Sequence, residues 1–262
     1  MSGQSIAALL PVDHAVIVVR DLIAASTLMS ELGFSVTAPA RHSAQMGTWN
    51  FCVMFAGFYL EFLSIENETP LNVGWQRSLA QGGGLRGLAL QMQGVPQTMQ
   101  VLDGLGIAHT QALSFTREDA ISGGNLAFSV VRLKQDNPTD IQILYCKHLT
   151  PHLMWGRGQY EHANSVAAVR ALGMHTEAPH IVQKILQKLA GGAPHSTKNP
   201  TVYASKSKSF ISLSFSTLHH AHKFIEKSRK LGMIARNVKG GVMLAGVSSC
   251  PLQFHIALSA LL

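Results

Sequence analysis

Residues 13–34, DHAVIVVRDLIAASTLMSELGF, are repeated in outline by residues 86–107, RGLALQMQGVPQTMQVLDGLGI. Leu105 aligns with Leu32 and no gap is needed, which sets the two copies 73 positions apart. Each copy begins with a short apolar run, continues with apolar residues at helical spacing, and closes on Leu-Gly followed by an apolar residue. This pattern predicts a strand, a helix, a glycine stop and the start of a second strand.

The duplication continues beyond each helix. Residues 59–70, YLEFLSIENETP, resemble residues 140–151, DIQILYCKHLTP, and in this alignment Gln142 falls on Glu61. Further strands are expected between the helix and this last strand, at 35–38 and 49–55 in the first copy and at 108–113 and 125–133 in the second. Each copy is therefore predicted to be a βαβββ module in an α+β fold.

The chain after residue 155 is less regular. Strands are expected at 165–172, 201–204, 210–215, 242–246 and 252–258, and helices at 179–189 and 218–231. These elements are fewer than two complete modules need, although PLQF at 251–254 resembles YLEF at 59–62. We therefore expect one domain of two modules at 1–155, and a second domain at 156–262 that holds a degenerate pair.

The composition is that of a globular protein with a substantial core, because 47% of the residues are hydrophobic and 13% are charged. No apolar run approaches the roughly 20 residues that span a bilayer, and the N-terminus lacks the basic start of a signal peptide. The three cysteines lie far apart and form no disulfide framework or metal motif. Buried thiols in the cytoplasm are the expectation, with no membrane partner.

The formal net charge is +7, and many of the excess lysines and arginines lie in the last quarter of the chain. Basic surface favours anionic partners, but no helix-turn-helix, zinc-finger or RNA-recognition pattern accompanies it. A solvated basic face is the preferred interpretation, and nucleic acid is not an expected partner. His219, His220 and His222 lack Cys or carboxylate partners at ligand spacing, which also favours a solvated helix face.

The tandem module that opens with DHAVIV at 13–18 is similar to the vicinal oxygen chelate superfamily. RH at 41–42, GTWN at 47–50 and YLE at 59–61 resemble its glyoxalase-like domain branch, as does KHLTP at 147–151 followed by Trp155. The resemblance covers about residues 12–165. It implies two modules that face each other as cupped half-barrel sheets, with a divalent metal in the cup bound by the first and last strands of each module.

On this resemblance, His14 and Glu61 are the metal ligands of the first module and the candidate catalytic residues. The repeat alignment gives Gly87 and Gln142 as their second-module counterparts. Gln142 offers a weak carbonyl oxygen and Gly87 offers no side chain, so the expected site for Zn, Ni, Mn or Fe is incomplete.

Four more residues are candidates for substrate binding: His42, Asn50, Arg117 and His148. His148 lies an even number of positions beyond Gln142 on one strand, which predicts that both side chains face the same way. Arg117 would neutralise an anionic substrate. A solvent-exposed His42, a turn-capping Asn50 and a surface Arg117 remain alternatives.

The expected function is to bind a small vicinal-oxygen substrate in the cup of the N-terminal domain. An anionic small molecule is one candidate for this ligand. A metal-assisted lyase, isomerase or dioxygenase is the first hypothesis, and a metal-free binding or sequestering protein of the resistance type is the alternative. A basic interaction module is a third. Whether the protein is an enzyme stays open at this point, and so does the choice between a monomer and a homodimer.

Overall fold

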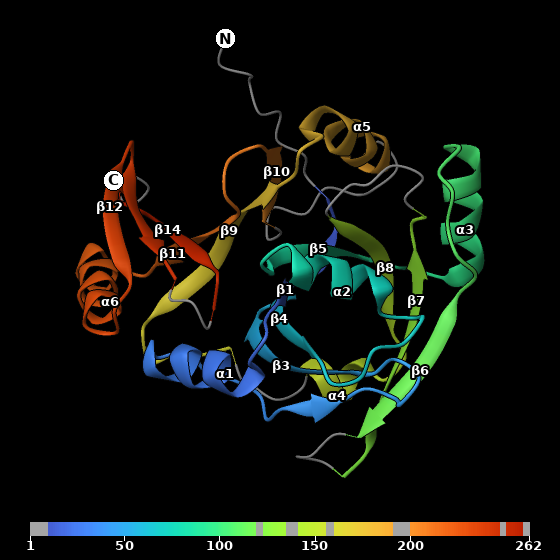
Figure 1. Cartoon of the computed structure of the whole chain (residues 1–262), viewed down its shortest axis with the longest axis horizontal. Coiled ribbons are helices and arrows are strands. Elements are labelled where there is room, and N and C mark those ends of the chain that lie inside the picture. Colours follow the sequence, from blue (N-terminus) through green and yellow to red (C-terminus); the bar gives the residue numbers. More distant parts are fainter. Residues whose placement is uncertain are drawn as a thin grey trace.

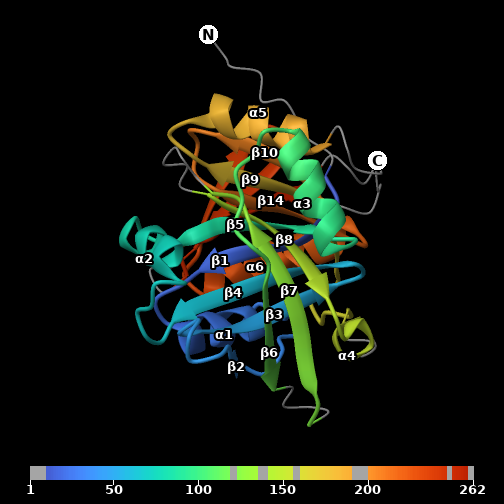
Figure 2. The ribbon, with the colours of Figure 1, turned by 90° about the vertical axis from the view of Figure 1, so that its right-hand side faces the viewer.

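The computed structural model describes residues 10–118, 123–134, 141–155, 160–190, 200–246 and 250–258. The described chain forms an α+β fold with two sheets, which lie next to each other in Figure 1 and one behind the other in Figure 2. The predicted fold class is therefore confirmed. The predicted domain boundary falls at residues 156–159, which lie outside the described residues, so the division stays a prediction. In the part of the chain that is described, no helix is long and apolar enough to cross a membrane.

The first module has the predicted order of elements. Its helix begins at the N-cap Asp21, whose carboxylate accepts a hydrogen bond from the Ala24 N–H, and it ends before Gly33 at a φ of 88°. The elements are β1 (Val12–Val18), α1 (Leu22–Glu31), β2 (Ala40–Arg41), β3 (Thr48–Phe55) and β4 (Phe58–Ile65).

The second module repeats this order, and Gly106 ends its helix at a φ of 64°. Its elements are β5 (Gly84–Gln91), α3 (Val95–Gly104), β6 (Leu113–Glu118), β7 (Asn125–Arg132) and β8 (Gln142–His148). Two short helices were not predicted: α2 (Val73–Ala80) lies between the modules, and α4 (Pro151–Trp155) follows the second one.

Both modules contribute to one eight-stranded sheet with the order β2-β3-β4-β1-β5-β8-β7-β6. The first strands of the modules, β1 and β5, pair antiparallel at its centre, and each pairs in parallel with the last strand of its own module. The edge strands β2 and β6 approach each other, so the sheet curls into the nearly closed ring seen in Figure 1.

The edge strands lie further along the chain than predicted. Residues 35–38 form no strand, and Val36 makes one isolated bridge to Val53 before β2 begins. Residues 108–112 behave in the same way, with one bridge from His109 to Leu133 before β6. In both modules the chain after the helix forms one isolated β-bridge to the sheet, and the edge strand begins only several residues later.

The C-terminal half forms a six-stranded sheet with the order β10-β9-β11-β14-β13-β12. The predicted elements are present, and one strand was missed, β12 (Ile234–Val238). It is largely exposed and pairs only with β13, so its sequence lacks the alternation of a half-buried strand. The elements are β9 (Val166–His175), α5 (Pro179–Ala190), β10 (Thr201–Ser205), β11 (Phe210–Phe215), α6 (Leu218–Lys230), β12, β13 (Gly241–Ala245) and β14 (Gln253–Ala257).

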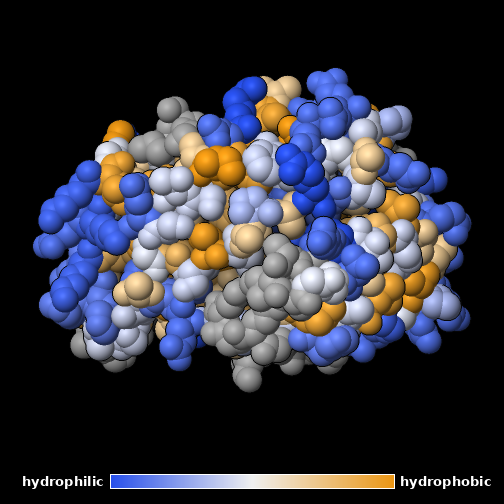
Figure 3. Space-filling model, turned by 90° about the horizontal axis from the view of Figure 1, so that it is seen from below, coloured by the Kyte–Doolittle hydropathy of each residue, from blue (hydrophilic) through white to orange (hydrophobic). Residues whose placement is uncertain are grey.

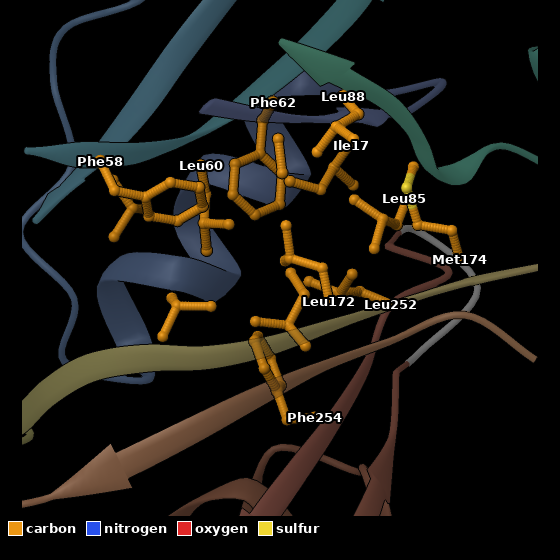
Figure 4. Packing of buried hydrophobic residues seen from close by; sticks show 14 of the residues in the cluster. Ile17, Phe58, Leu60, Phe62, Leu85, Leu88, Leu172, Met174, Leu252 and Phe254 are labelled. Atoms are coloured by element: carbon orange, nitrogen blue, oxygen red, sulfur yellow. The ribbon is translucent and has the colours of Figure 1, made fainter. Parts of the chain in front are cut away.

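The main hydrophobic core lies between the two sheets and includes the buried faces of both. Figure 4 shows Ile17 and Phe62 from the first sheet near Leu172 and Phe254 from the second. A separate apolar cluster, which includes Val16 and Trp75, lines the inside of the curled sheet. The outward face of β1 thus packs in the core between the two sheets, and its inward face lies inside the curled sheet.

Hydrophilic residues gather at the end of the molecule formed by α6, at the left of Figure 3. His219, His222 and the lysines and arginine of this helix are exposed, as expected for a solvated basic face. Cys52, Cys146 and Cys250 are free and buried, which agrees with the prediction for the thiols.

Candidate functional site

The curled first sheet encloses a cavity with an empty volume of about 580 Å³, including open solvent at its mouth. The charged and polar residues that line it come from both modules. They are His14, His42, Asn50, Glu61, Arg117 and Arg132, and the apolar lining includes Trp75, Phe115, Phe128, Val130 and Leu144. Five of the seven candidate site residues from the sequence lie here, and His148 and Gln142 lie outside this lining.

A β-bulge in β1 turns two consecutive side chains toward the cavity side of the sheet. The pairing with β5 skips Asp13, because Val12 pairs with Leu90 and His14 pairs with Ala89. Val12 and Ala15 belong to the core between the sheets, so Asp13 and His14 both face inward. Bulges commonly re-aim side chains beside active sites.

The bulge makes Asp13 the link between two histidines. Its Oδ1 lies 2.6 Å from His14 Nδ1 and 3.0 Å from His148 Nε2. Burial by itself raises the pKa of the Asp13 carboxyl, but hydrogen bonds from the two histidines outweigh burial and lower this pKa to about 2. Asp13 is therefore a carboxylate over the physiological pH range, and both ring nitrogens that contact it donate a hydrogen.

Glu61 lies on the other side of His14. Its Oε2 is 3.5 Å from His14 Nε2, and its Oε1 accepts a hydrogen bond of 2.5 Å from Asn50 Nδ2. Tyr59 stacks on the His14 ring with a centroid distance of 4.4 Å and an angle of 21°, which fixes the ring plane. The sequence prediction that His14 and Glu61 share one hollow is thus met by the geometry.

His42 extends the same polar chain. Its Nδ1 lies 2.9 Å from Thr48 Oγ1, and its Nε2 lies 3.9 Å from Glu61 Oε1. Its side chain is 6% exposed, so the alternative of a solvent-exposed His42 is excluded. Burial lowers the pKa of His42 to about 4; Arg117 and Arg132 add to this effect, and Glu61 opposes it.

This low pKa of His42 predicts a loss of stability on acidification. Between about pH 6.5 and pH 4 the unfolded chain protonates this histidine and the folded chain does not, so the free energy of unfolding falls as the pH falls. The pKa difference corresponds to about 3 kcal/mol. Urea unfolding at pH 7 and pH 4.5 measures it, and His42→Gln is expected to lose much less stability over this interval. An equal loss in both proteins would contradict the assignment.

Arg117 and Arg132 place two guanidinium groups against the cavity. Among the described residues Arg117 makes no hydrogen bond or ion pair, and Arg132 donates one hydrogen bond of 2.6 Å, to the Leu71 carbonyl oxygen. The Nε of each is buried without a partner. Burial lowers the pKa of Arg132, and the nearby Glu61 partly offsets this. The alternative of Arg117 as a surface arginine is excluded, since it is 9% exposed.

The strand register corrects the repeat alignment at the metal positions. In the first module His14 pairs with Tyr59, and in the second module Gly87 pairs with Gln142. Gln142 is therefore the counterpart of Tyr59, and the counterpart of Glu61 is Leu144, two residues further on. The sequence alignment missed this shift because the copies differ in length in the loop before β8.

Helix α2 occupies the second-module side of the expected metal site. A Cβ on Gly87 would lie 2.7 Å from Trp75 Cη2, and the side chain of Gln142 packs against Gly74 and lines a separate, smaller pocket. The four superfamily positions thus supply two donors, His14 and Glu61, and stable metal sites use three or four protein ligands. The residues present do not fit the metal site that the resemblance implies, and Gln142 is not one of its ligands.

A different group of three potential ligands lies beside the cavity. Within the described part of the chain, ligand atoms of Asp13, Cys146 and His148 lie within 4.8 Å of one another. The Asp13 oxygen of this group already accepts hydrogen bonds from two histidines, and burial raises the pKa of the Cys146 thiol well above its usual range. Asp13 and His148 of this group are hydrogen-bonded to each other, and Asp13 is also hydrogen-bonded to His14, whose ring it orients.

Sequence reasoning missed three functional residues. Asp13 stands next to a predicted site residue, but strict strand alternation points it away from the cavity, and only the bulge reverses it. Arg132 lies within the strand expected at 125–133, and its spacing from Phe128 and Val130 is that of one strand face, but it was not named as a site residue. Trp75 lies in a helix that was not predicted.

Tandem βαβββ modules that curl around a cavity define the class of protein: an α+β fold of the vicinal oxygen chelate type. The model of a family described as "Glyoxalase-like domain" matches residues 12–190. The chain therefore belongs to the glyoxalase-like domain family. A comparison with curated proteins finds no match.

Solved structures with a similar fold cover nearly the whole chain. A hypothetical protein from Staphylococcus aureus has a TM-score of 0.64 at 9% identity, covering 94% of this chain and 98% of its own. A mutant 4-hydroxymandelate synthase from Streptomyces coelicolor has a TM-score of 0.56 at 10% identity, covering 95% and 93%. The 2,3-dioxygenase LapB from Pseudomonas sp. KL28 gives the same TM-score, identity and coverage. At these identities the likeness concerns the fold.

Proposed function

We propose that this protein is an isomerase or lyase that moves a proton on a small vicinal-oxygen substrate in the cavity of the first sheet. The observation that carries the proposal is the series Asp13, His14 and Glu61, in which Asp13 is hydrogen-bonded to His14 and Glu61 lies within ion-pair distance of His14. Its distances are 2.6 Å from Asp13 Oδ1 to His14 Nδ1 and 3.5 Å from His14 Nε2 to Glu61 Oε2.

The Asp13 carboxylate fixes which nitrogen of His14 carries a hydrogen. A carboxylate only accepts, so Nδ1 donates to it, and the lone pair of a neutral ring lies on Nε2. This lone pair faces the Glu61 carboxylate, which is also an acceptor. The two groups are therefore stable together when they share one proton, either on His14 or on Glu61.

An isomerisation by proton transfer needs a general acid next to a general base, and here His14 with its proton is the acid and the Glu61 carboxylate is the base. The Glu61 carboxylate takes the hydrogen from a substrate carbon next to a carbonyl, and the C–H electron pair becomes a C=C bond. The carbonyl oxygen takes the His14 proton and gives an enediol. Glu61 then returns its proton to the former carbonyl carbon, and the hydroxyl on the other carbon gives its proton to His14 and becomes the new carbonyl, so both groups are regenerated with no net redox change. General acid–base catalysis of this kind contributes roughly 10²–10⁴-fold.

The other groups of the cavity orient the substrate. Asn50 holds Glu61 through its amide, and its own Oδ1 is buried without a partner. His42 is neutral near pH 7 because of its low pKa, and it offers a polar contact without charge. Burial raises the pKa of Cys52 to about 12, so its thiol is not a thiolate nucleophile. His148 acts through Asp13 as a positioning residue.

A metal-assisted reaction or a dioxygenase would need metal ligands from the second module as well, and Gly87 and Leu144 at those positions offer none. The proposed reaction therefore uses only the side chains of this protein. The alternative of a binding or sequestering protein gains support from the same gap in the ligand set. The cytoplasmic location and the oligomeric state stay predictions.

Proton exchange into solvent tests the proposal. The protein is incubated in D₂O with pyruvate, 2-oxobutanoate, lactate, acetoin and dihydroxyacetone, and ¹H NMR follows the loss of the C–H signals. We expect exchange of at least one compound, lost in Glu61→Gln and His14→Gln and retained in Glu66→Gln, a matched change at the surface partner of Arg41. A chelator is expected to leave exchange intact. Tight binding of a compound without exchange would favour the sequestering protein instead.

A further inference from the structure

Among the described residues, no carboxylate forms a hydrogen bond or an ion pair with either of the two cavity arginines. Arg117 belongs to β6 and Arg132 to β7, both in the second module. A guanidinium carries five N–H donors, and among the described residues the two side chains together make one hydrogen bond, from Arg132 to the Leu71 carbonyl oxygen. Buried charges are costly unless they are paired, so two such groups beside one cavity indicate a missing acceptor.

The charges that line the cavity do not balance. Arg117 and Arg132 are positive, and Glu61 is the one carboxylate among the lining residues. Asp13 lies outside the lining and is already engaged by two histidines. The His14–Glu61 pair shares one proton and is neutral overall, and His42 is neutral near pH 7. The two arginines and the Asp13 carboxylate therefore leave one positive charge, which a ligand with one negative charge neutralises.

The wall beside the arginines is apolar and aromatic. Phe115 and Phe128 stack with a centroid distance of 5.4 Å and an angle of 25°, and both line the cavity with Val130. They come from the same two strands as the arginines. The second module thus offers an anion-binding pair next to an apolar surface, and the first module offers the acid–base groups.

We propose that the ligand is a small monocarboxylate with an apolar substituent, whose carboxylate lies toward Arg117 and Arg132 and whose apolar part lies against Phe115 and Phe128. This deepens the proposed function, because it assigns the binding half of the same cavity. Arginine suits the task, since its planar fork of donors matches a carboxylate. Arg132 becomes a specificity residue that the sequence did not suggest.

Calorimetric titration tests this with matched pairs of probes: benzoate against benzamide, phenylacetate against phenylacetamide, and acetate against acetamide. We expect at least one aromatic acid to bind, with at least tenfold weaker binding of its neutral amide and of acetate. Arg117→Gln and Arg132→Gln are each expected to weaken the acid at least tenfold. Arg236→Gln, an exposed arginine of β12, serves as the control and is expected to bind like the wild type.

Glu61→Gln separates this inference from the proposed reaction. This variant is expected to lose proton exchange and to keep acid binding, because the His14–Glu61 pair is neutral overall and His14 without its partner carboxylate is neutral as well. If exchange fails and acid binding follows the arginines, the reaction is wrong and the ligand class stands. Equal binding of acids and amides, absence of binding by every acid, or unchanged binding in both arginine variants overturns the ligand class. Thermal unfolding of each variant checks that it is folded.

Discussion

Asp13→Ala is expected to lower the free energy of unfolding by about 2–6 kcal/mol, because it leaves two buried ring N–H groups without an acceptor at a cost of about 1–3 kcal/mol each. Asp13 is 4% exposed and accepts hydrogen bonds from His14 and His148. Its loss leaves two buried ring nitrogens without an acceptor, and His148 Nδ1 already lacks a partner. Urea unfolding at pH 7 measures the change.

Two control substitutions test whether the cost of Asp13→Ala comes from the loss of its contacts with the histidines. Asp21→Ala removes a carboxylate that accepts one bond from the Ala24 N–H at a helix start, and its expected cost is about 1 kcal/mol. Asp13→Asn keeps the shape of the side chain and removes its charge, so it is expected to fall between the two. If Asp13→Ala costs no more than Asp21→Ala, the histidines do not depend on Asp13 and the proposed support of His14 is wrong.

Trp75→Ala is expected to cost about 3 kcal/mol, the lower end for loss of a buried tryptophan, because one side of the ring borders the cavity. Trp75 is 6% exposed, and its Cη2 occupies the space next to Gly87. Trp49→Ala is the matched control: Trp49 is half-buried on β3 beneath Arg41, and its removal is expected to cost less. Thermal or urea unfolding compares the two.

A double-mutant cycle tests the contact itself. Gly87→Ala is expected to cost about 1–3 kcal/mol in the wild type, since the new Cβ would lie 2.7 Å from both Trp75 Cη2 and Val16 Cβ. In the Trp75→Ala background one of these two clashes is gone, so the same substitution is expected to cost less. Additive costs would mean that Trp75 does not fill the second-module position.

The repeat in the sequence was enough to predict both modules, and the resemblance to the vicinal oxygen chelate superfamily implied that His14 and Glu61 share one hollow. Apolar spacing located the helices α1 and α3. These features depend on local periodicity, which a single sequence carries. The C-terminal half was harder to predict from the sequence, because the exposed hairpin strand β12 has no buried face and therefore no alternation of apolar and polar residues.

The remaining parts of the site depend on pairing between distant strands. The bulge at Asp13 appears only where β1 meets β5, and the counterpart of Glu61 is decided by the register of β8 against β5. Helix α2 lacks a long apolar stripe, and its position against Gly87 and Gln142 follows from packing rather than from its own sequence. Periodicity carries none of this information.

The division of the cavity between the duplicated halves has a consequence for how such proteins diversify. His14, Asn50 and Glu61 stand on one half, whereas both arginines and both phenylalanines stand on the other. Substitutions on β6 and β7 can therefore change which compound is accepted and leave the reactive groups in place.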